Sequence, residues 1–326
     1  MKLLRRIWPL LLLVVLVAVN SLVWLQRDQI ADWWRLRNYE PPKDIAALVS
    51  DDTMTSYAER MFYVNHPVLE SKDAFNENCS DHDEETSVLG CYHGDRQGIY
   101  IFAVTDKRLD GVRQVTAAHE MLHQAYDRLS EDDREHVSKL LREYYESGKL
   151  TEQIQTKVDS YKNQKDSDLT NEMHSIFGSE VRQLPQELED YYKRYFDDRS
   201  KVIGFSEAYR GEFTRRKDLV AQYDKQLSSL KSQINANKQD LATKSAFLKS
   251  KEKEIKQDVS SRNQPEYQSD VAAYNAMVDA YNAQLIETRR LIEEHNAIVV
   301  KRNAIAVQEQ ELQEALDSRL EPSSKQ

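Results

Sequence analysis

Glycine and proline are scarce in this chain of 326 residues, which holds eight glycines and seven prolines. Such a composition predicts a mostly helical protein. All eight glycines fall between Gly90 and Gly211, so tight turns and strands should concentrate there. After Gly211 there is no glycine, and Pro265 is the only proline before the tail. The last third of the chain is therefore expected to be helix.

An excess of positive charge is also absent. The formal net charge is −10, and charged residues make up 31% of the chain. A general nucleic-acid-binding protein needs a basic surface. The composition therefore argues against nucleic acid as a partner.

Cysteine is limited to two residues, Cys79 and Cys91, which lie close together in a polar loop and hairpin region. An even pair at this spacing favours a disulfide in an oxidising compartment. Two free thiols in a cytoplasmic protein remain the alternative. The pair favours an extracytoplasmic location.

A long apolar run occupies residues 7–25. Its 19 residues are enough to cross a bilayer core as a helix, at about 1.5 Å per residue. Trp8 and Trp24 lie near the ends of the run, and Trp33 and Trp34 lie just beyond it. Tryptophans placed in this way anchor at the level of the lipid headgroups. The sequence therefore predicts a transmembrane anchor in the lipid bilayer.

A cleaved signal peptide is the alternative for this segment. Val19-Asn-Ser21 would make a poor cleavage site and the run is long for a signal, which favours an uncleaved signal-anchor. The positive-inside rule does not decide the orientation, because three basic residues flank the run on each side. Its place at the extreme N-terminus favours a single-pass cell-membrane protein with a cytoplasmic tail at residues 1–6 and an extracytoplasmic bulk.

Residues 26–44 are expected to form a juxtamembrane linker, stiffened by Tyr39-Glu-Pro-Pro-Lys43. A globular domain should follow at residues 45–204. Short strands are expected at 87–92 and 98–104, joined by a turn-rich connection in an antiparallel hairpin. Helices are expected over the segments whose apolar residues recur at three- and four-residue steps: 44–49, 55–63, 115–129, 130 onward, 150–163, 168–182 and 185–200.

The helix expected at 115–129 contains the pattern His119-Glu120-x-x-His123. Histidines at i and i+4 project from the same helix face, about 5–6 Å apart at Cβ. Both imidazoles can then reach one Zn²⁺ at roughly 2.0–2.1 Å. Glu120 lies beside the metal, where it can hold the metal-bound water and act as general base. The alternative is an ordinary surface helix that carries two histidines.

A strand followed by a helix with HEMLH resembles the zincin superfamily of metallopeptidases. In zincins the strand at the edge of the cleft binds the substrate in extended form, which would implicate Ile99–Val104. The metzincin subgroup continues its motif with a glycine and a third histidine. This chain has Tyr126 and Leu129 at those positions, which excludes that subgroup. The resemblance is therefore to the gluzincins, which take a glutamate ligand from a later helix.

The gluzincin resemblance implies Glu172 as the third zinc ligand, because Asn-Glu-x-x-Ser at residues 171–175 is similar to the third-ligand helix of that group. His174 and Glu180 are the reserve candidates for this ligand. A group that stabilises the transition state is also needed, and His174 and Tyr161 are the candidates. Asp127 and Asp168 could orient the ligand histidines, although each alone is more simply a solvated carboxylate.

From about Phe205 the chain shows heptad spacing on both sides of Pro265. Before the proline, apolar residues follow one seam: Val220, Tyr223, Leu227, Leu230, Ile234, Leu241, Leu248 and Ile255. After it they follow another: Val271, Tyr274, Val278, Tyr281, Leu285, Ile292 and Val299. Two such helices around one breaker predict an antiparallel coiled-coil hairpin and tail at residues 205–326. A parallel dimer of hairpins is the alternative, so the hairpin could self-associate or bind a protein partner.

The expected fold is mostly α with a small antiparallel β-hairpin or sheet, as an α+β zincin-like domain, followed by the long coiled-coil hairpin. The expected function is a membrane-anchored zinc metallopeptidase that hydrolyses polypeptide substrates. The main alternative is a coiled-coil scaffold of the cell envelope with a structural or degenerate metal site. A hydrolase of some other bond is a third possibility, because a zincin-like site does not name the bond that is cleaved.

Overall fold

The computed structural model describes residues 13, 16–18, 20–21, 23–24, 26–79, 89–162, 166–261 and 264–319. It divides into two compact units. The first unit contains residues 1–210 together with 314–326, and the second contains residues 211–313. Helices dominate both units, as the composition predicts.

The predicted anchor at residues 7–25 lies mostly outside the described residues. Within the part of the chain that is described, no helix combines the length and the apolar character needed to cross a membrane. The predicted linker at residues 26–44 differs from an extended tether, because helix α2 (Arg27–Leu36) forms its first half. A turn at residues 37–38 and four residues without regular structure follow before the next helix begins at Lys43, and the Tyr39 ring stacks on His66 with centroids 4.4 Å apart.

The helices predicted at 44–49, 55–63 and 150–163 are present, and a helix starts after Ser130 as predicted, whereas the helix at Lys72–Asn78 was not predicted. Thr55 caps α4 (Ser56–Tyr63) by accepting a hydrogen bond from the Ala58 N–H, and Ser130 caps α7 (Glu131–Glu146) in the same way from the Asp133 N–H. Such caps satisfy backbone donors that a helix N-terminus leaves without partners. Helix α2 is followed by α3 (Lys43–Asp51), α4 (Ser56–Tyr63) and α5 (Lys72–Asn78).

The sheet confirms the predicted hairpin and corrects the expectation of a purely antiparallel arrangement. Strand β2 (Gly90–His93) pairs antiparallel with β3 (Gly98–Phe102). A third strand, β1 (Val68–Glu70), pairs parallel with the other side of β3, so the sheet is mixed, with the order β1-β3-β2. A strand of three residues is too short to show a period-2 pattern, which is why the sequence did not predict it.

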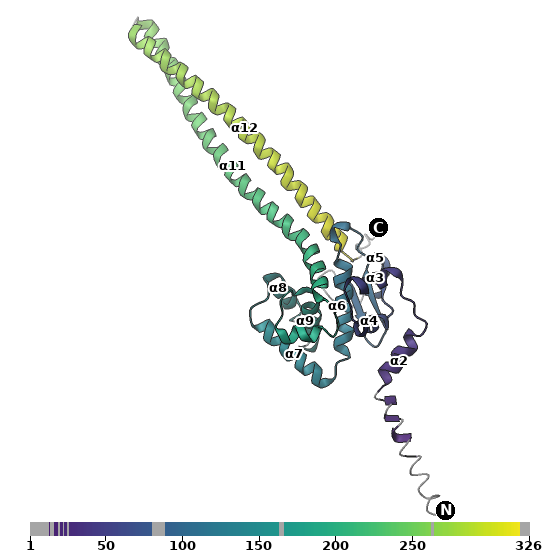
Figure 1. Ribbon diagram of the computed structural model, residues 1–326. Coiled ribbons are helices and arrows are strands. Elements are labelled where there is room, and N and C mark those ends of the chain that lie inside the picture. Colours follow the sequence, from purple (N-terminus) through teal and green to yellow (C-terminus); the bar gives the residue numbers. More distant parts are fainter. Residues whose placement is uncertain are drawn as a thin grey trace, which may run out of the picture. The chain divides into compact units, whose positions relative to one another are not determined.

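Helices α6 (Val112–Asp127) and α9 (Asp166–Glu180) pack closely in the core of the first unit (Figure 1). Gly178 permits this approach, because a Cβ at that position would lie 2.5 Å from Leu122 Cδ1 and 2.7 Å from Tyr192 Cε1. Fully buried side chains surround the contact: Phe62, Met121, Leu122, Phe177, Tyr192 and Phe196. Helices α7 (Glu131–Glu146) and α8 (Glu152–Ser160) also pack against α9.

The helix predicted at 185–200 is interrupted. Helix α10 (Gln186–Tyr192) ends before a turn in which Phe196 forms a β-bridge with Met54, and α11 begins at Arg199. The Arg199 guanidinium is buried and donates hydrogen bonds to the Phe177 and Val181 carbonyls, at 3.2 and 2.6 Å. It also pairs with Glu189. These bonds satisfy carbonyls at the C-terminal end of α9, which has no helical partners for them.

Replacing Arg199 with methionine is expected to lower the free energy of unfolding of the first unit by about 3–5 kcal/mol, because buried carbonyls and Glu189 would lose their partner. Arg182→Met is the matched control. Arg182 pairs with Glu207, but both side chains are nearly half exposed, at 47% and 45%. Loss of such a surface pair costs below about 1 kcal/mol. Urea unfolding followed by proteolysis measures both values, and equal losses would contradict the assignment.

The second unit is an antiparallel pair of long helices, as predicted. They belong to α11 (Arg199–Ser261) and α12 (Gln264–Leu316), which run side by side in Figure 1. Leu230, Ile234 and Leu291 are buried in the seam between them. Ion pairs connect the two helices, with Arg302 on Asp224 at 2.8 Å and Lys251 on Asp270 at 2.7 Å.

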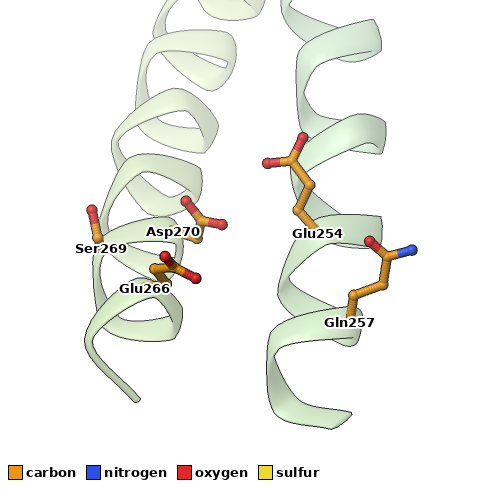
Figure 2. Close-up of a pocket in the computed structure, with 5 residues that line it drawn as sticks. All are labelled: Glu254, Gln257, Glu266, Ser269 and Asp270. Atoms are coloured by element: carbon orange, nitrogen blue, oxygen red, sulfur yellow. The ribbon is translucent and has the colours of Figure 1, made fainter. Parts of the chain in front are cut away.

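At the turn end of the hairpin, the two helices border a shallow polar groove (Figure 2). Glu254 and Gln257 reach it from α11, and Glu266, Ser269 and Asp270 reach it from α12. Lys251 pairs with both Glu254 and Asp270 beside the groove. Lys251 therefore neutralises part of the negative charge that lines the groove.

Candidate metal centre

Helix α6 carries both histidines of the HEMLH pattern and presents them to α9. Gly111 precedes the helix with a φ of 100°, which glycine adopts without strain. Ala117 and Ala118 are fully buried, so their small side chains allow neighbouring elements to come close. His119 and His123 lie one turn apart, with ring centroids 4.7 Å apart.

Glu172 of α9 faces both imidazoles. His119 Nε2 lies 3.6 Å from Glu172 Oε2, and His123 Nε2 lies 3.5 Å from Glu172 Oε1. Both distances exceed those of ordinary N–H···O hydrogen bonds. One nitrogen of each histidine and one oxygen of Glu172 all lie within 4.8 Å of one another. The structure therefore brings together the three residues predicted as ligands, although Glu172 follows His123 by 49 positions in the sequence.

These residues fit a zinc ion. Two ligand atoms at roughly 2.0–2.1 Å from a tetrahedral zinc lie about 3.3–3.4 Å apart. Each imidazole lies near that separation from one oxygen of Glu172, with His123 3.5 Å from Oε1 and His119 3.6 Å from Oε2. The Glu172 Oε2 atom is buried and accepts no hydrogen bond from the described residues. A buried carboxylate oxygen without a partner is costly unless a cation is near. Two imidazoles and one carboxylate also match the ligand chemistry of catalytic zinc sites.

The electrostatic surroundings keep Glu172 ionised. Burial raises the pKa of its carboxyl group, but His123, His119 and Lys157 act in the opposite direction and bring the pKa to about 2. A carboxylate must be deprotonated to ligate a metal. Glu172 is therefore in its ligand form across the physiological pH range.

Asn171 fixes the orientation of the His123 imidazole. His123 Nδ1 lies 3.0 Å from Asn171 Oδ1, and an amide oxygen can only accept, so Nδ1 carries the proton. The lone pair of His123 then resides on Nε2, the atom that faces Glu172. Ligand histidines commonly make such a bond with their second nitrogen. The sequence motif included Asn171, but its role as a hydrogen-bond acceptor was not predicted.

Asn171→Ala is expected to weaken zinc binding by about 10–100-fold, the usual effect of removing a partner behind a ligand histidine. Asn171→Asp keeps an oxygen acceptor at the same position and should retain affinity close to the parent. Competition with a fluorescent chelator measures both dissociation constants. An alanine variant that binds zinc as tightly as the parent would show that Asn171 does not position His123.

Glu120 is buried against strand β2. A Cβ on Gly90 would lie 2.6 Å from Glu120 Oε1 and 2.5 Å from Thr116 Cγ2. The Glu120 carboxylate therefore occupies space that any other residue at position 90 would fill. Glu120 follows His119 directly along α6 and packs against Gly90 of β2. Gly90 was not predicted from the sequence, because its importance depends on the side chain packed against it and not on its neighbours in the chain.

The strand beside the candidate metal centre is β2, which corrects the implied role of Ile99–Val104. Strand β3 is the central strand and has a partner on each side, whereas β2 is at the edge of the sheet. The Phe102 N–H donates to the Leu89 carbonyl at 2.9 Å. Because paired residues alternate along an antiparallel ladder, Gly90 and Tyr92 direct their backbone N–H and C=O groups toward the outer edge. No described strand pairs with that edge.

His174 does not join the three ligand residues. It is fully buried, and its Nε2 lies 2.9 Å from the Tyr191 hydroxyl in a cluster of tyrosine rings. Burial and the nearby His123 lower the pKa of His174 to about 3, so the imidazole is neutral. Its roles as a reserve ligand or transition-state stabiliser are not supported by this placement. In a helix, a residue two positions after Glu172 points to nearly the opposite side.

The other predicted candidates occupy separate positions. Glu180 is buried and pairs with Lys157 at 2.5 Å, so its carboxylate is used in an ion pair. Tyr161 caps the C-terminus of α8 and packs partly buried against the core, near Lys157. Asp127 accepts a hydrogen bond from Tyr92, and burial raises the pKa of Asp127. The side chain of Asp168 lies outside the described residues.

The predicted disulfide is present. Cys79 and Cys91 are bonded, with their Cα atoms 6.0 Å apart. Cys79 follows α5, and Cys91 lies on β2, next to Gly90. The bond therefore holds the edge strand to α5 one residue away from the contact with Glu120.

Comparisons of the chain with protein-family models, with curated proteins and with solved structures found no match. The candidate metal centre therefore rests on the arrangement of His119, His123 and Glu172 in this structure.

Proposed function

We propose that this chain is a zinc-dependent peptidase. The observation that carries the proposal is the convergence of His119, His123 and Glu172, with the buried carboxylate of Glu120 beside them. Structural zinc sites have four protein ligands, whereas catalytic sites have three and leave a position open for water. Three ligand groups come together here among the described residues, which supports a catalytic rather than a structural site.

Zinc bound at these residues would polarise a carbonyl and lower the pKa of a bound water toward about 7. Glu120 is the general base in this proposal. It would accept a proton from the attacking water and then donate that proton to the amine of the cleaved peptide. Asn171 holds His123 in the tautomer that leaves Nε2 available.

A polypeptide is the substrate class that the surroundings favour. The outer edge of β2 offers backbone groups of Gly90 and Tyr92, and an extended peptide can add to such an edge as another strand. The absence of a side chain at Gly90 leaves the backbone close to Glu120. A peptide bond of the added strand would then lie near the base.

The proposed location is the cell membrane, with the peptidase unit on the extracytoplasmic side. The Cys79–Cys91 disulfide supports an oxidising compartment. The apolar run at residues 7–25 supports a single transmembrane anchor. The coiled-coil hairpin would serve as a spacer or as a docking arm for a partner protein.

The test uses the full chain in lipid nanodiscs, loaded with zinc and incubated with a mixture of unstructured peptides. We expect cleavage at defined bonds by mass spectrometry, loss of cleavage with 1,10-phenanthroline, and recovery after zinc is added back. His123→Ala, purified in parallel, controls for contaminating proteases. A zinc-loaded protein that cleaves no peptide would favour the scaffold with a structural metal site.

A further inference from the structure

Helix α2 presents two chemically different faces. Asp28, Asp32 and Arg35 share one side of the helix, because they lie at i, i+4 and i+7. Ile30, Trp33, Trp34 and Arg37 share the opposite side at i, i+3, i+4 and i+7. A helix on a globular domain ordinarily turns its apolar face toward the core. In α2 the polar face is the one that contacts the domain.

Asp32 makes the central contact of this polar face. Its side chain is buried, with 4% exposed, and it accepts hydrogen bonds from Arg128 at 2.6 and 2.9 Å. Arg96 Nε donates to the same carboxylate at 3.0 Å, and Arg96 also pairs with Asp28 at 2.9 Å. Arg35 donates to the Val64 carbonyl. A buried carboxylate shared by two guanidinium groups fixes the helix firmly to the domain.

The opposite face exposes large aromatic rings. Trp33 and Trp34 are 59% and 62% exposed, and Trp24, just before the helix, is 68% exposed. Arginine guanidinium groups lie over these rings, with Arg27 at 5.3 Å from Trp24 and Arg37 at 5.4 Å from Trp34. Water is a poor environment for the exposed Trp33 and Trp34 rings, whose centroids lie 5.3 Å apart.

Lipid headgroups suit this surface better than water does. Tryptophan is enriched at the membrane interface, where its ring meets the apolar chains and its N–H meets the headgroups. Arginine extends its charged end toward lipid phosphates from the same depth. In the sequence, α2 also follows almost directly after the apolar run at residues 7–25.

We propose that the exposed face of α2, formed by Ile30, Trp33, Trp34 and Arg37, binds the headgroup region of a lipid bilayer while Asp32 holds the helix to the first unit. Arg128 follows the last residue of α6, and Arg96 lies in the turn between β2 and β3. The contacts of Asp32 with Arg96 and Arg128, here called the clamp, therefore join α2 to the β2–β3 hairpin and to α6. These are the two elements that border the candidate metal centre. Binding of α2 to lipid sets the distance and tilt of that centre above the bilayer. The proposal does not depend on peptidase activity.

The first experiment measures the depth of the α2 tryptophans. The full chain with Trp8→Phe and Trp24→Phe, which retains only Trp33 and Trp34, is reconstituted into vesicles of phosphatidylcholine with or without bromine on the acyl chains near the headgroup. We expect bromine to lower the emission by about twofold or more, with little quenching by aqueous acrylamide. Strong acrylamide quenching without bromine quenching would overturn the proposal. Protection from both quenchers would also overturn it, because the rings would then be covered by protein.

The second experiment tests the clamp by amide hydrogen exchange in the same vesicles. Asp32→Asn removes the charge shared by Arg96 and Arg128, and we expect exchange across Arg27–Leu36 to accelerate by about tenfold or more, while bromine quenching persists. Asp44→Asn, a change of the same type in the first turn of α3, is the control and should leave exchange in α2 unchanged. Unchanged exchange in Asp32→Asn would show that the clamp does not hold α2 to the unit.

Discussion

Glu120→Gln is expected to abolish peptide cleavage by the zinc-loaded protein while leaving its zinc content unchanged. Glutamine keeps the size of the side chain and its fit beneath Gly90, but it cannot accept the proton of the attacking water. General-base catalysis contributes about 10²–10⁴-fold to a rate, so kcat should fall by that factor. Because Glu120 is not one of the three converging ligand groups, the metal should remain bound.

The control for this variant is Glu146→Gln, which makes the same change at an exposed position near the end of α7. Its kcat and zinc content should both match those of the parent. Initial rates on a cleaved peptide and metal analysis of the same preparation give the two values. Loss of zinc in Glu120→Gln would contradict the assigned role and place Glu120 in the metal shell.

Gly90→Ala is expected to reduce kcat by about 10²-fold, the scale of effect that a displacement of roughly 1 Å has on a catalytic group. The new methyl group would lie 2.6 Å from Glu120 Oε1 and 2.5 Å from Thr116 Cγ2, which is too close for either atom to stay in place. The end of the glutamate side chain is the more easily moved of the two. The added methyl group does not reach the proposed ligands His119, His123 and Glu172 in its nearest contacts, so the metal content should be preserved.

Gly94→Ala is the matched control in the same β-hairpin. A Cβ there meets Asp127 Oδ2 at 3.9 Å, which is an ordinary contact. Activity and stability should therefore remain close to those of the parent. Gly90→Ala should also unfold more easily by about 1–3 kcal/mol, the usual cost of overpacking. Full activity in Gly90→Ala would mean that the position of Glu120 relative to β2 does not matter for catalysis.

Local patterns in the sequence predicted the parts of the fold that depend on near neighbours. The i, i+4 spacing of His119 and His123 depends only on helix geometry, and the structure has both residues on α6. The heptad spacing on both sides of Pro265 predicted the paired helices. The spacing of Cys79 and Cys91 predicted the disulfide.

Features that depend on distant pairing were not predicted. Strand β1 is defined by its partner β3, about thirty positions later, and its three residues carry no pattern of their own. Its presence covers the second side of β3 and so makes β3 the central strand, which leaves β2 as the edge strand of the hairpin. The break between α10 and α11 likewise depends on the bridge from Phe196 to Met54.

The candidate site shows the same division. Glu172 came from resemblance to a motif, and only the packing of α6 on α9 brings its carboxylate to the histidines. His174 could have been set aside on helix geometry, since it lies two positions from Glu172 and faces another side of α9. Gly90 gains its importance from the carboxylate packed against it, which no local pattern reveals.

The zinc content of the purified full chain, beside His123→Ala and Glu172→Ala, tests the central claim most directly. We expect about one zinc per chain in the parent and a large loss of zinc in both variants, because each removes one of three ligands. Arg199→Lys is the control for indirect effects, because it disturbs the C-terminal end of α9 without removing a proposed ligand. Its zinc content should match that of the parent. A parent chain that takes up no zinc, even after incubation with excess metal, would contradict the account and make TAAHEMLHQAYDRLS an ordinary helix of the fold.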